Sequence, residues 1–293
     1  MLDTPWQPLT MHPDPDLPAT PALPVLQPHH PVGPQLARAR WSTRALFGSL
    51  GVLGGVWGAH VPSIKAAYGL DEARLAAVLF CAAVGAVASL FIAGRVIGAL
   101  GARRTSLLTG LVLAAMLGLA LVWPAVVWLM AASLCFGAAM SVFDVAINAE
   151  GTALESASGR PLMGNLHGCF SLGAMAGAAL AAAMLRAQVA APLQLEMVGI
   201  VIAGVVWAVN AGMLDARPAP PADGAEQRHF AWPHGLLLAI GLLIFAGMTA
   251  EGVMYDWCVL YLKQDVGLSQ ADAALGYAAF AGAMALSRFA GDT

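Results

Sequence analysis

Charged residues are scarce in this sequence. They make up only 11% of the 293 residues, whereas soluble domains usually carry about 25%. Hydrophobic residues account for 59%, and the mean hydropathy is +0.73. A chain this apolar has too little polar surface to cover a water-soluble globule of its length. The composition therefore excludes a soluble enzyme and a disordered scaffold, and it predicts an integral membrane protein.

The sequence also lacks a basic patch and any metal- or redox-type cysteine pattern. Its net charge is −3 and its pI is near 6.1, which excludes a large polyanion-binding surface, so no nucleic-acid partner is expected. The four cysteines stand singly in apolar runs, without C-x-x-C spacing or a disulfide framework. The patterns G-x-S-x-G, H-E-x-x-H and the P-loop are absent as well. We therefore expect no metal site, no cofactor and no enzymatic activity.

Residues 1–41 differ in composition from the rest of the chain. Proline is concentrated there, and no apolar period is present before the first long apolar stretch begins at Ser42. A segment of this kind cannot bury enough apolar surface to fold and stays extended and solvated. We predict a disordered cytoplasmic tail that acts as a spacer.

Eight apolar stretches follow, each long enough to cross a hydrocarbon core about 30 Å thick, which takes about 20 residues. They are expected at residues 42–64, 74–97, 105–123, 125–147, 161–185, 193–214, 234–262 and 271–290. The proline- and charge-rich segment 215–233 separates the first six from the last two and predicts a cytoplasmic central loop. The sequence therefore predicts an all-α membrane protein with a six-helix bundle at 42–214 and the start of a second bundle at 234–293.

The positions of lysine and arginine predict the orientation of these spans. With the amino terminus in the cytoplasm, the basic residues on the inside are Arg38, Arg40, Arg44, Arg95, Arg103, Arg104, Arg160, Arg217, Arg228 and Arg288. Those on the outside are Lys65, Arg74, Arg186 and Lys263. Because cytoplasmic segments of membrane proteins carry the excess of lysine and arginine, we expect the amino terminus to lie inside.

An internal repeat relates the two ends of the apolar region. The segment 65–73, KAAYGLDEA, reappears as 263–271, KQDVGLSQA, at an offset of 198 residues. Each copy is followed by a span that ends in an arginine and a glycine three residues apart, at Arg95 and Arg288. Six spans separate the copies, so the repeat is parallel, and two such halves predict about twelve helices in all. We therefore expect the second half to be incomplete here, as in a truncated chain.

Two basic segments resemble a loop signature of a known transporter family. The segment 95–104, RVIGALGARR, and the segment 287–292, SRFAGD, are both similar to the G-x-x-x-D-R-x-G-R-R motif of the major facilitator superfamily. The matching residues are Arg95, Gly98, Gly101, Arg103 and Arg104 in the first copy, and Arg288, Gly291 and Asp292 in the second. The resemblance implies a cytoplasmic gating motif in which basic side chains bind helix carboxyl ends. The alternative is a topology signal with no gating role.

Three further segments indicate a branch of that superfamily. They are 143–150, FDVAINAE; 167–173, HGCFSLG; and 251–257, EGVMYDW. Together they resemble the YbjJ-like transporters, a branch close to the fucose permeases. The resemblance covers residues 42–293 and implies a carrier in the bacterial inner membrane that works by alternating access.

Polar residues at membrane depth are the first candidate functional groups, because a charge there needs a partner, water or a function. Asp144 and Asn148 are one helical turn apart on the fourth span, and His167 is expected at a similar depth on the fifth. An Asp144–His167 pair could bind and release a proton near neutral pH. The alternative is a static hydrogen bond that holds two helices together.

The seventh span carries the strongest candidate in the second half. Glu251 and Tyr255 share one face of that span at a spacing of four residues. A carboxyl among apolar neighbours can carry a proton at neutral pH, so Glu251 is expected to couple transport to protons or to bind a hydroxylated solute. Asp256 is expected close to the outer interface, and His60 of the first span is expected to be a solvated interface histidine.

Taken together, these patterns predict a secondary active transporter of a small polar solute, coupled to protons. Its expected partners are the lipid bilayer, the solute and protons, and no obligate protein partner is evident. Two other classes remain open, namely a non-transporting membrane sensor and an inert fragment of a transporter. The fragment remains open because the substrate site of such a carrier lies between its two halves.

Overall fold

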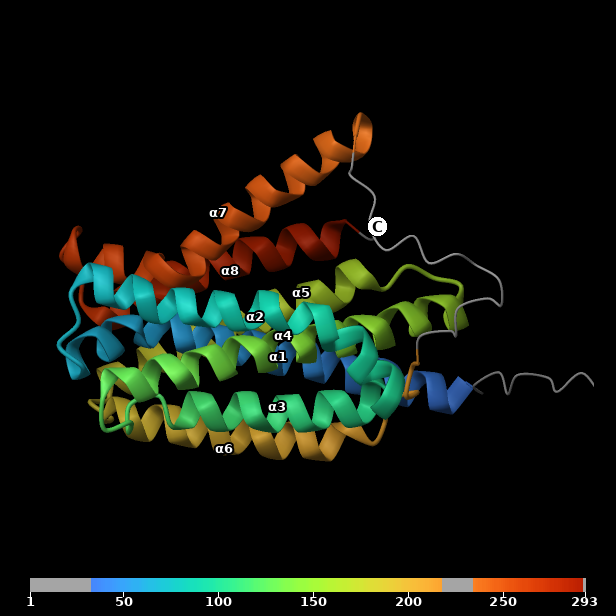
Figure 1. The fold of residues 1–293 in the computed structure, drawn as a ribbon, viewed down its shortest axis with the longest axis horizontal. Coiled ribbons are helices and arrows are strands. Elements are labelled where there is room, and N and C mark those ends of the chain that lie inside the picture. The colour runs from blue at the N-terminus through green and yellow to red at the C-terminus, as the bar shows by residue number, and fades with distance from the viewer. Residues whose placement is uncertain (1–32, 218–233, 292–293) are drawn as a thin grey trace, which may run out of the picture. The chain divides into compact units, whose positions relative to one another are not determined.

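The computed structural model describes residues 33–217 and 234–291, which form eight α-helices (Figure 1). In chain order they are α1 (Gly33–Ala67), α2 (Glu72–Leu100), α3 (Ala102–Gly118), α4 (Val126–Ser158), α5 (Met163–Arg186), α6 (Ala191–Asn210), α7 (Leu236–Gln264) and α8 (Gln270–Ala290). Seven of them are long and apolar enough to cross a membrane. The remaining helix, α3, has 17 residues and is about 26 Å long at about 1.5 Å per residue. The prediction of eight helices in an all-α fold is therefore confirmed for the described residues.

The ends of α1 and α4 differ from the prediction. α1 begins at Gly33, so the prediction of a disordered tail is wrong for residues 33–41, and the rest of that tail lies outside the described residues. Pro34 stands in the first turn, where its fixed φ suits a helix and its missing N–H has no helical acceptor to lose. α4 continues past residue 147 and ends at Ser158, where Gly159 takes a left-handed φ of 62°. Hydropathy marks the membrane-crossing part of a helix, whereas caps mark its ends.

The connection between α3 and α4 is longer than the single residue left between the expected spans 105–123 and 125–147. α3 ends at Gly118, and residues 119–125 form turns before α4 begins. The hydroxyl of Tyr68 holds this connection, because it donates to the Ala120 carbonyl and accepts from the Trp123 N–H, both at 3.1 Å. Burial raises the pKa of the Tyr68 hydroxyl, and the hydrogen bond from Trp123 opposes that shift.

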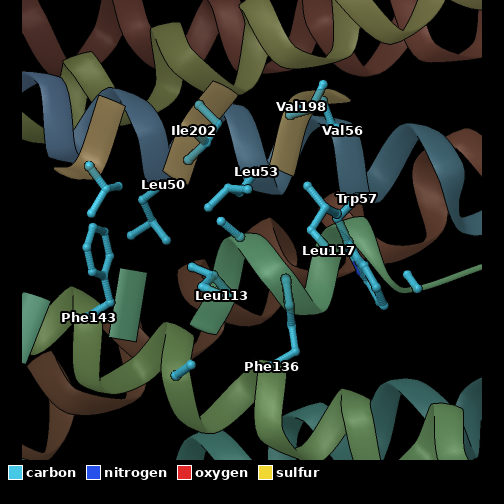
Figure 2. Packing of buried hydrophobic residues seen from close by; sticks show 14 of the residues in the cluster. Leu50, Leu53, Val56, Trp57, Leu113, Leu117, Phe136, Phe143, Val198 and Ile202 are labelled. Atoms are coloured by element: carbon cyan, nitrogen blue, oxygen red, sulfur yellow. The ribbon is translucent and has the colours of Figure 1, made fainter. Parts of the chain in front are cut away.

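α1 forms the centre of the hydrophobic core. Its buried side chains face three other helices of the first bundle, as Figure 2 shows. The labelled residues are Leu50, Leu53, Val56 and Trp57 of α1, Leu113 and Leu117 of α3, Phe136 and Phe143 of α4, and Val198 and Ile202 of α6. Because lipid tails are as apolar as these side chains, close packing rather than transfer from water stabilises the contacts.

Glycines bring two helix pairs into backbone contact. Gly55 of α1 faces the Ala174 carbonyl of α5, and Gly85 of α2 faces the Leu134 carbonyl of α4. A Cβ atom added to either glycine would collide with the facing backbone. Small residues commonly allow this close approach between membrane helices. The α1–α5 and α2–α4 interfaces therefore depend on the absence of side chains at these positions.

The two copies of the sequence repeat have the same local structure. At the end of α1, Lys65 donates to Glu72 at 2.5 Å. At the end of α7, Lys263 donates to Gln270 at 2.9 Å. These two contacts join residues that correspond exactly at the offset of 198. The two copies of the repeat therefore share side-chain contacts as well as sequence similarity.

The helix starts that follow the two loops correspond as well, but the two arginines do not. α2 and α8 begin after the N-caps Asp71 and Ser269, and each cap side chain accepts a hydrogen bond from the backbone N–H three residues on. Arg95 and Arg288 are 193 residues apart, which is five short of the repeat offset. Arg95 is exposed on α2, whereas Arg288 is half-buried on α8. The two arginines therefore do not occupy equivalent positions of the repeat.

α8 and the carboxyl-terminal part of α7 contact the first six helices. α8 packs closely on α5, and α7 contacts α1. Every residue from 234 to 250 is exposed, whereas the buried residues of α7 begin at Glu251. Figure 1 shows the first part of α7 diverging from α8. The side chains of α7 that meet the first bundle therefore lie between Glu251 and Gln264.

Candidate functional site

A buried ion pair joins α7 to α8. The guanidinium of Arg288 donates to both carboxylate oxygens of Glu251, at 2.8 and 3.0 Å. The Tyr255 hydroxyl donates a further hydrogen bond to Glu251 from one turn along α7. The side chains of Glu251 and Arg288 are only 10% and 21% exposed, so each charge depends mainly on the other for compensation.

Arg288 also ties α8 to α5. Its guanidinium donates to the Ser171 hydroxyl at 2.6 Å and, more weakly, to the His167 carbonyl at 3.5 Å. It lies over the ring of Phe170 at 5.9 Å. Sequence reasoning placed Arg288 in a cytoplasmic loop motif, whereas the structure places it in the last turn of α8 with its charge directed to Glu251. One arginine thus connects α5, α7 and α8.

The structure does not bring Asp144 and His167 together. Asp144 accepts a hydrogen bond at 3.0 Å from the side-chain amide of Asn148, which also donates to the Asp144 carbonyl at 2.9 Å. The His167 ring packs edge-on against Phe47, with 5.2 Å between ring centroids. Within the described part of the chain no hydrogen bond or ion pair joins the two residues. The reason is that α4 packs mainly against α2 and α3, whereas α5 packs against α1 and α8.

A cavity of about 230 Å³ lies between the first bundle and α7. α1, α2, α4 and α5 supply most of its wall, and α7 supplies Gly252, Tyr255 and Asp256. Asp256, which was predicted close to the outer interface, lies in α7 and borders this cavity. Because Tyr255 borders the cavity and donates to Glu251, the ion pair and the cavity are neighbours.

The first copy of the basic motif contacts the segment after α6. Gly101 has a φ of 81°, and a Cβ atom there would collide with the carboxylate of Asp215. That carboxylate accepts from the Arg103 N–H at 3.2 Å and lies 3.8 Å from the Arg217 guanidinium. The other motif residues, Arg95, Gly98, Arg104 and Gly291, are exposed, and Asp292 lies outside the described residues. Among the motif residues that the structure describes, only Gly101 and Arg103 therefore contact the segment that follows α6.

A buried carboxylate that sequence reasoning missed holds the same segment from the other side. Glu150 of α4 is fully buried and accepts hydrogen bonds from the backbone N–H groups of Leu214 and Ala216, the latter at 3.1 Å. The Ala216 carbonyl in turn accepts from Ala102 at the start of α3 at 2.9 Å. Glu150 therefore fixes the chain where it leaves α6.

His60 is buried, so its prediction as a solvated interface histidine is wrong. Its Nε2 lies 3.0 Å from the Gln194 side-chain oxygen of α6, and its Nδ1 lies 3.2 Å from the Ser63 hydroxyl. Gln270 of α8 donates to the same hydroxyl at 2.7 Å and to the Ala59 carbonyl at 2.9 Å. These polar contacts link α6, α1 and α8 at the ends of those helices opposite Glu150.

Comparison with known proteins agrees with this architecture. The sequence profile of the Major Facilitator Superfamily matches residues 45–293. The chain is 36% identical to an uncharacterised MFS-type transporter of Yersinia pestis over 86% of this chain and 64% of the relative. It is 30% identical to an uncharacterised transporter of Sinorhizobium fredii over 83% and 64% of the two chains. It is 29% identical to the membrane protein MosC of Rhizobium meliloti over 83% and 58%.

These observations define the class of the protein. Seven of the eight described helices are of membrane-spanning length, and α1, α2, α4, α5 and α7 line a cavity beside the Glu251–Arg288 pair, as expected of a multi-pass membrane protein. The chain belongs to the major facilitator superfamily. It spans 58–64% of the length of the three relatives.

Proposed function

We propose that the protein forms all or part of a secondary active transporter that moves a small polar solute by alternating access and is coupled to protons. The observation that carries this proposal is the cavity beside the Glu251–Arg288 pair. The cavity between the first bundle and α7 offers space for a solute, and the Glu251 carboxyl lies next to it. Membership of a transporter superfamily supports the same reading.

The proposed carrier has about twelve helices in two pseudo-symmetric halves. Residues 42–214 form the first half, 215–233 form a cytoplasmic connection, and 234–293 begin the second half. The matching side-chain contacts in the two repeat loops support the symmetry. The distribution of basic residues supports a cytoplasmic amino terminus, and the segments 143–150, 167–173 and 251–257 favour a bacterial inner-membrane branch close to the fucose permeases.

Proton coupling would act through the charge on Glu251. When ionised, this carboxylate compensates Arg288, which also donates to Ser171 of α5. When Glu251 is protonated, the guanidinium loses its counter-ion in a half-buried position. Because α8 connects the second half to α5, the protonation state of Glu251 then changes which arrangement of the two halves is favoured.

The cytoplasmic contacts give the proposed gate. Asp215, held beside Gly101 and Arg103, brings the end of α6 against the turn between α2 and α3. Opening the cytoplasmic side in the transport cycle requires helices near this turn to move relative to α7 and α8. The proposed polar groups of the solute pathway are Asp144, Asn148 and His167. Asp144 and Asn148 belong to α4 and His167 belongs to α5, and no Asp–His pair is part of the proposal.

The test of transport uses the protein in proteoliposomes loaded with a pH-sensitive dye. Radiolabelled small polar solutes are added one at a time, with and without an inward proton gradient. We expect at least one solute to accumulate only with the gradient and to acidify the lumen. Glu251→Gln is expected to abolish gradient-driven uptake and to preserve exchange of internal for external solute, whereas the exposed control Glu196→Gln keeps both.

Three results would contradict the proposal. Equal loss of uptake and exchange in Glu251→Gln would exclude the coupling role of that residue. Saturable solute binding by the wild-type protein without any flux would favour the non-transporting sensor, and absence of both binding and flux would favour an inert fragment.

A further inference from the structure

The cavity has mostly apolar walls that are rich in aromatic rings. Its principal side chains are Trp57, Phe136, Met140, Phe170, Tyr255 and Asp256. Trp57 and Phe136 stack with ring centroids 4.8 Å apart, and the Tyr255 ring lies edge-on to Phe170 at 6.1 Å. At about 230 Å³ the cavity is slightly below the usual range of roughly 300–1,000 Å³ for ligand pockets. It therefore suits a small ligand.

The cavity wall includes one carboxylate without a counter-ion. Within residues 33–217 and 234–291, Asp256 belongs to none of the ion pairs. No lysine, arginine or histidine borders the cavity. The Trp57 indole, whose N–H is a hydrogen-bond donor, borders the same cavity. A carboxylate at membrane depth is costly unless a partner or a ligand compensates its charge.

The cavity offers few groups that could bind a polyhydroxylated solute. Apart from Asp256 and the Trp57 indole, its polar side chain is Tyr255, and the Tyr255 hydroxyl already donates to Glu251. A sugar would leave most of its hydroxyls without partners in this cavity, and each unpaired buried group costs about 1–3 kcal/mol. An organic cation needs only one anion and the faces of aromatic rings.

We propose that the cavity binds a small organic cation, with the Asp256 carboxylate as its counter-ion and the rings of Trp57 and Tyr255 against its alkyl groups. This inference rests on the proposed function, because it names the class of solute that the same cavity would take. Compensation of Asp256 by the ligand removes the cost of an unpaired charge, and aromatic faces attract a cation most strongly where water is excluded. A neutral ligand of the same shape gains neither contribution.

The binding test compares choline with its uncharged isostere 3,3-dimethyl-1-butanol, which have the same shape. Both are measured by equilibrium dialysis against the full chain in lipid nanodiscs. We expect choline to bind saturably and at least tenfold more tightly than the alcohol. Asp256→Asn is expected to weaken choline binding at least tenfold and to leave binding of the alcohol unchanged. Asp256→Glu keeps the charge and is expected to keep the preference for choline.

Matched controls separate the site from general damage to the protein. Glu196→Gln removes an exposed acid on α6, and Trp207→Leu removes a ring that is 68% exposed on the same helix. Neither is expected to change choline binding, whereas Trp57→Leu is expected to weaken it at least fivefold. The thermal unfolding of each variant is recorded, so that a variant that fails to fold is recognised. If Asp256→Asn fails to fold, the choline preference of Asp256→Glu is measured in its place.

The outcomes separate this inference from the transport proposal. Equal binding of choline and the alcohol, an unchanged preference in Asp256→Asn, or no saturable choline binding would each overturn the cation site. Uptake of an uncharged solute without choline binding would retain the transporter and reject the cation site. Choline binding that depends on Asp256, with no flux of any solute, would retain the cation site and reject transport.

Discussion

Glu251 and Arg288 are 37 residues apart in the sequence, yet two hydrogen bonds of 2.8 and 3.0 Å join their side chains. The guanidinium that compensates the carboxylate of α7 also donates to Ser171 of α5. Arg288 therefore joins α8 both to the Glu251 carboxyl of α7 and to α5. The charge of that carboxyl is the quantity that a proton changes.

Replacement of Arg288 by methionine should destabilise the protein. The substitution leaves the Glu251 carboxylate buried without a counter-ion, and we expect the free energy of unfolding to fall by about 3–5 kcal/mol. The double variant Glu251→Gln/Arg288→Met should recover much of this loss, because no buried charge remains. Unfolding of the wild type, both single variants and the double variant in detergent measures the coupling. Additive losses would show that the two side chains do not interact.

Bulk at the α1–α5 interface should prevent close packing. Gly55→Val places side-chain atoms against the Ala174 carbonyl, and we expect a loss of at least about 1–3 kcal/mol. Gly204→Val on α6 is the matched control, because a Cβ atom at Gly204 has nothing within 4 Å. Thermal unfolding in detergent compares the two variants. Similar unfolding temperatures would mean that α1 and α5 do not approach as closely as described.

The eight helices could be predicted because the thickness of the bilayer fixes the length of an apolar run. The Glu251–Tyr255 contact could also be foreseen, since residues four apart on one helix share a face whatever the fold. The helix ends could not, because α4 stops at Gly159 through its backbone conformation and not through a change in hydropathy. Local geometry and lipid thickness thus account for what was predicted.

Contacts between helices were the part that sequence reasoning missed. His60 and Gln194 are 134 residues apart, and the helical period does not say which faces of two helices meet. One signal was available for the ion pair. Membrane-embedded acids usually have a partner, and Arg288 is the one basic residue of the eighth span, so a search for a base opposite Glu251 would have found it. Asp144 was paired with His167 because the two were expected at a similar depth, but their helices pack against different neighbours.

Loss of the His60 imidazole should weaken the contacts among α1, α6 and α8. His60→Leu leaves the Gln194 side-chain oxygen without its partner in a buried position, which we expect to cost about 1–3 kcal/mol. His60→Gln can still donate to that oxygen and should cost less. Unfolding measurements on both variants test this. Equal stability of the leucine and glutamine variants would indicate that packing, not the hydrogen bond, stabilises this region.

Neutralising Glu150 should loosen the chain where it leaves α6. The two oxygens of the carboxylate accept from Leu214 and Ala216, and in Glu150→Gln one of them is replaced by an NH2 group that cannot accept. We expect tryptic cleavage after Arg217 to become several-fold faster. Glu196→Gln, an exposed acid on α6, should leave the rate unchanged. An unaltered cleavage rate in Glu150→Gln would show that other contacts, such as those of Asp215, are sufficient to hold the segment.

Duplicated segments can diverge through a single change of functional group. Where the first repeat loop has the carboxylate of Glu72, the second has the amide of Gln270. A carboxylate only accepts hydrogen bonds, whereas an amide also donates. Gln270 therefore keeps the lysine of its own copy and in addition donates to Ser63 and Ala59 of α1. The amide at this position thus contacts both its own copy and α1, whereas the carboxylate of Glu72 contacts the lysine of its own copy.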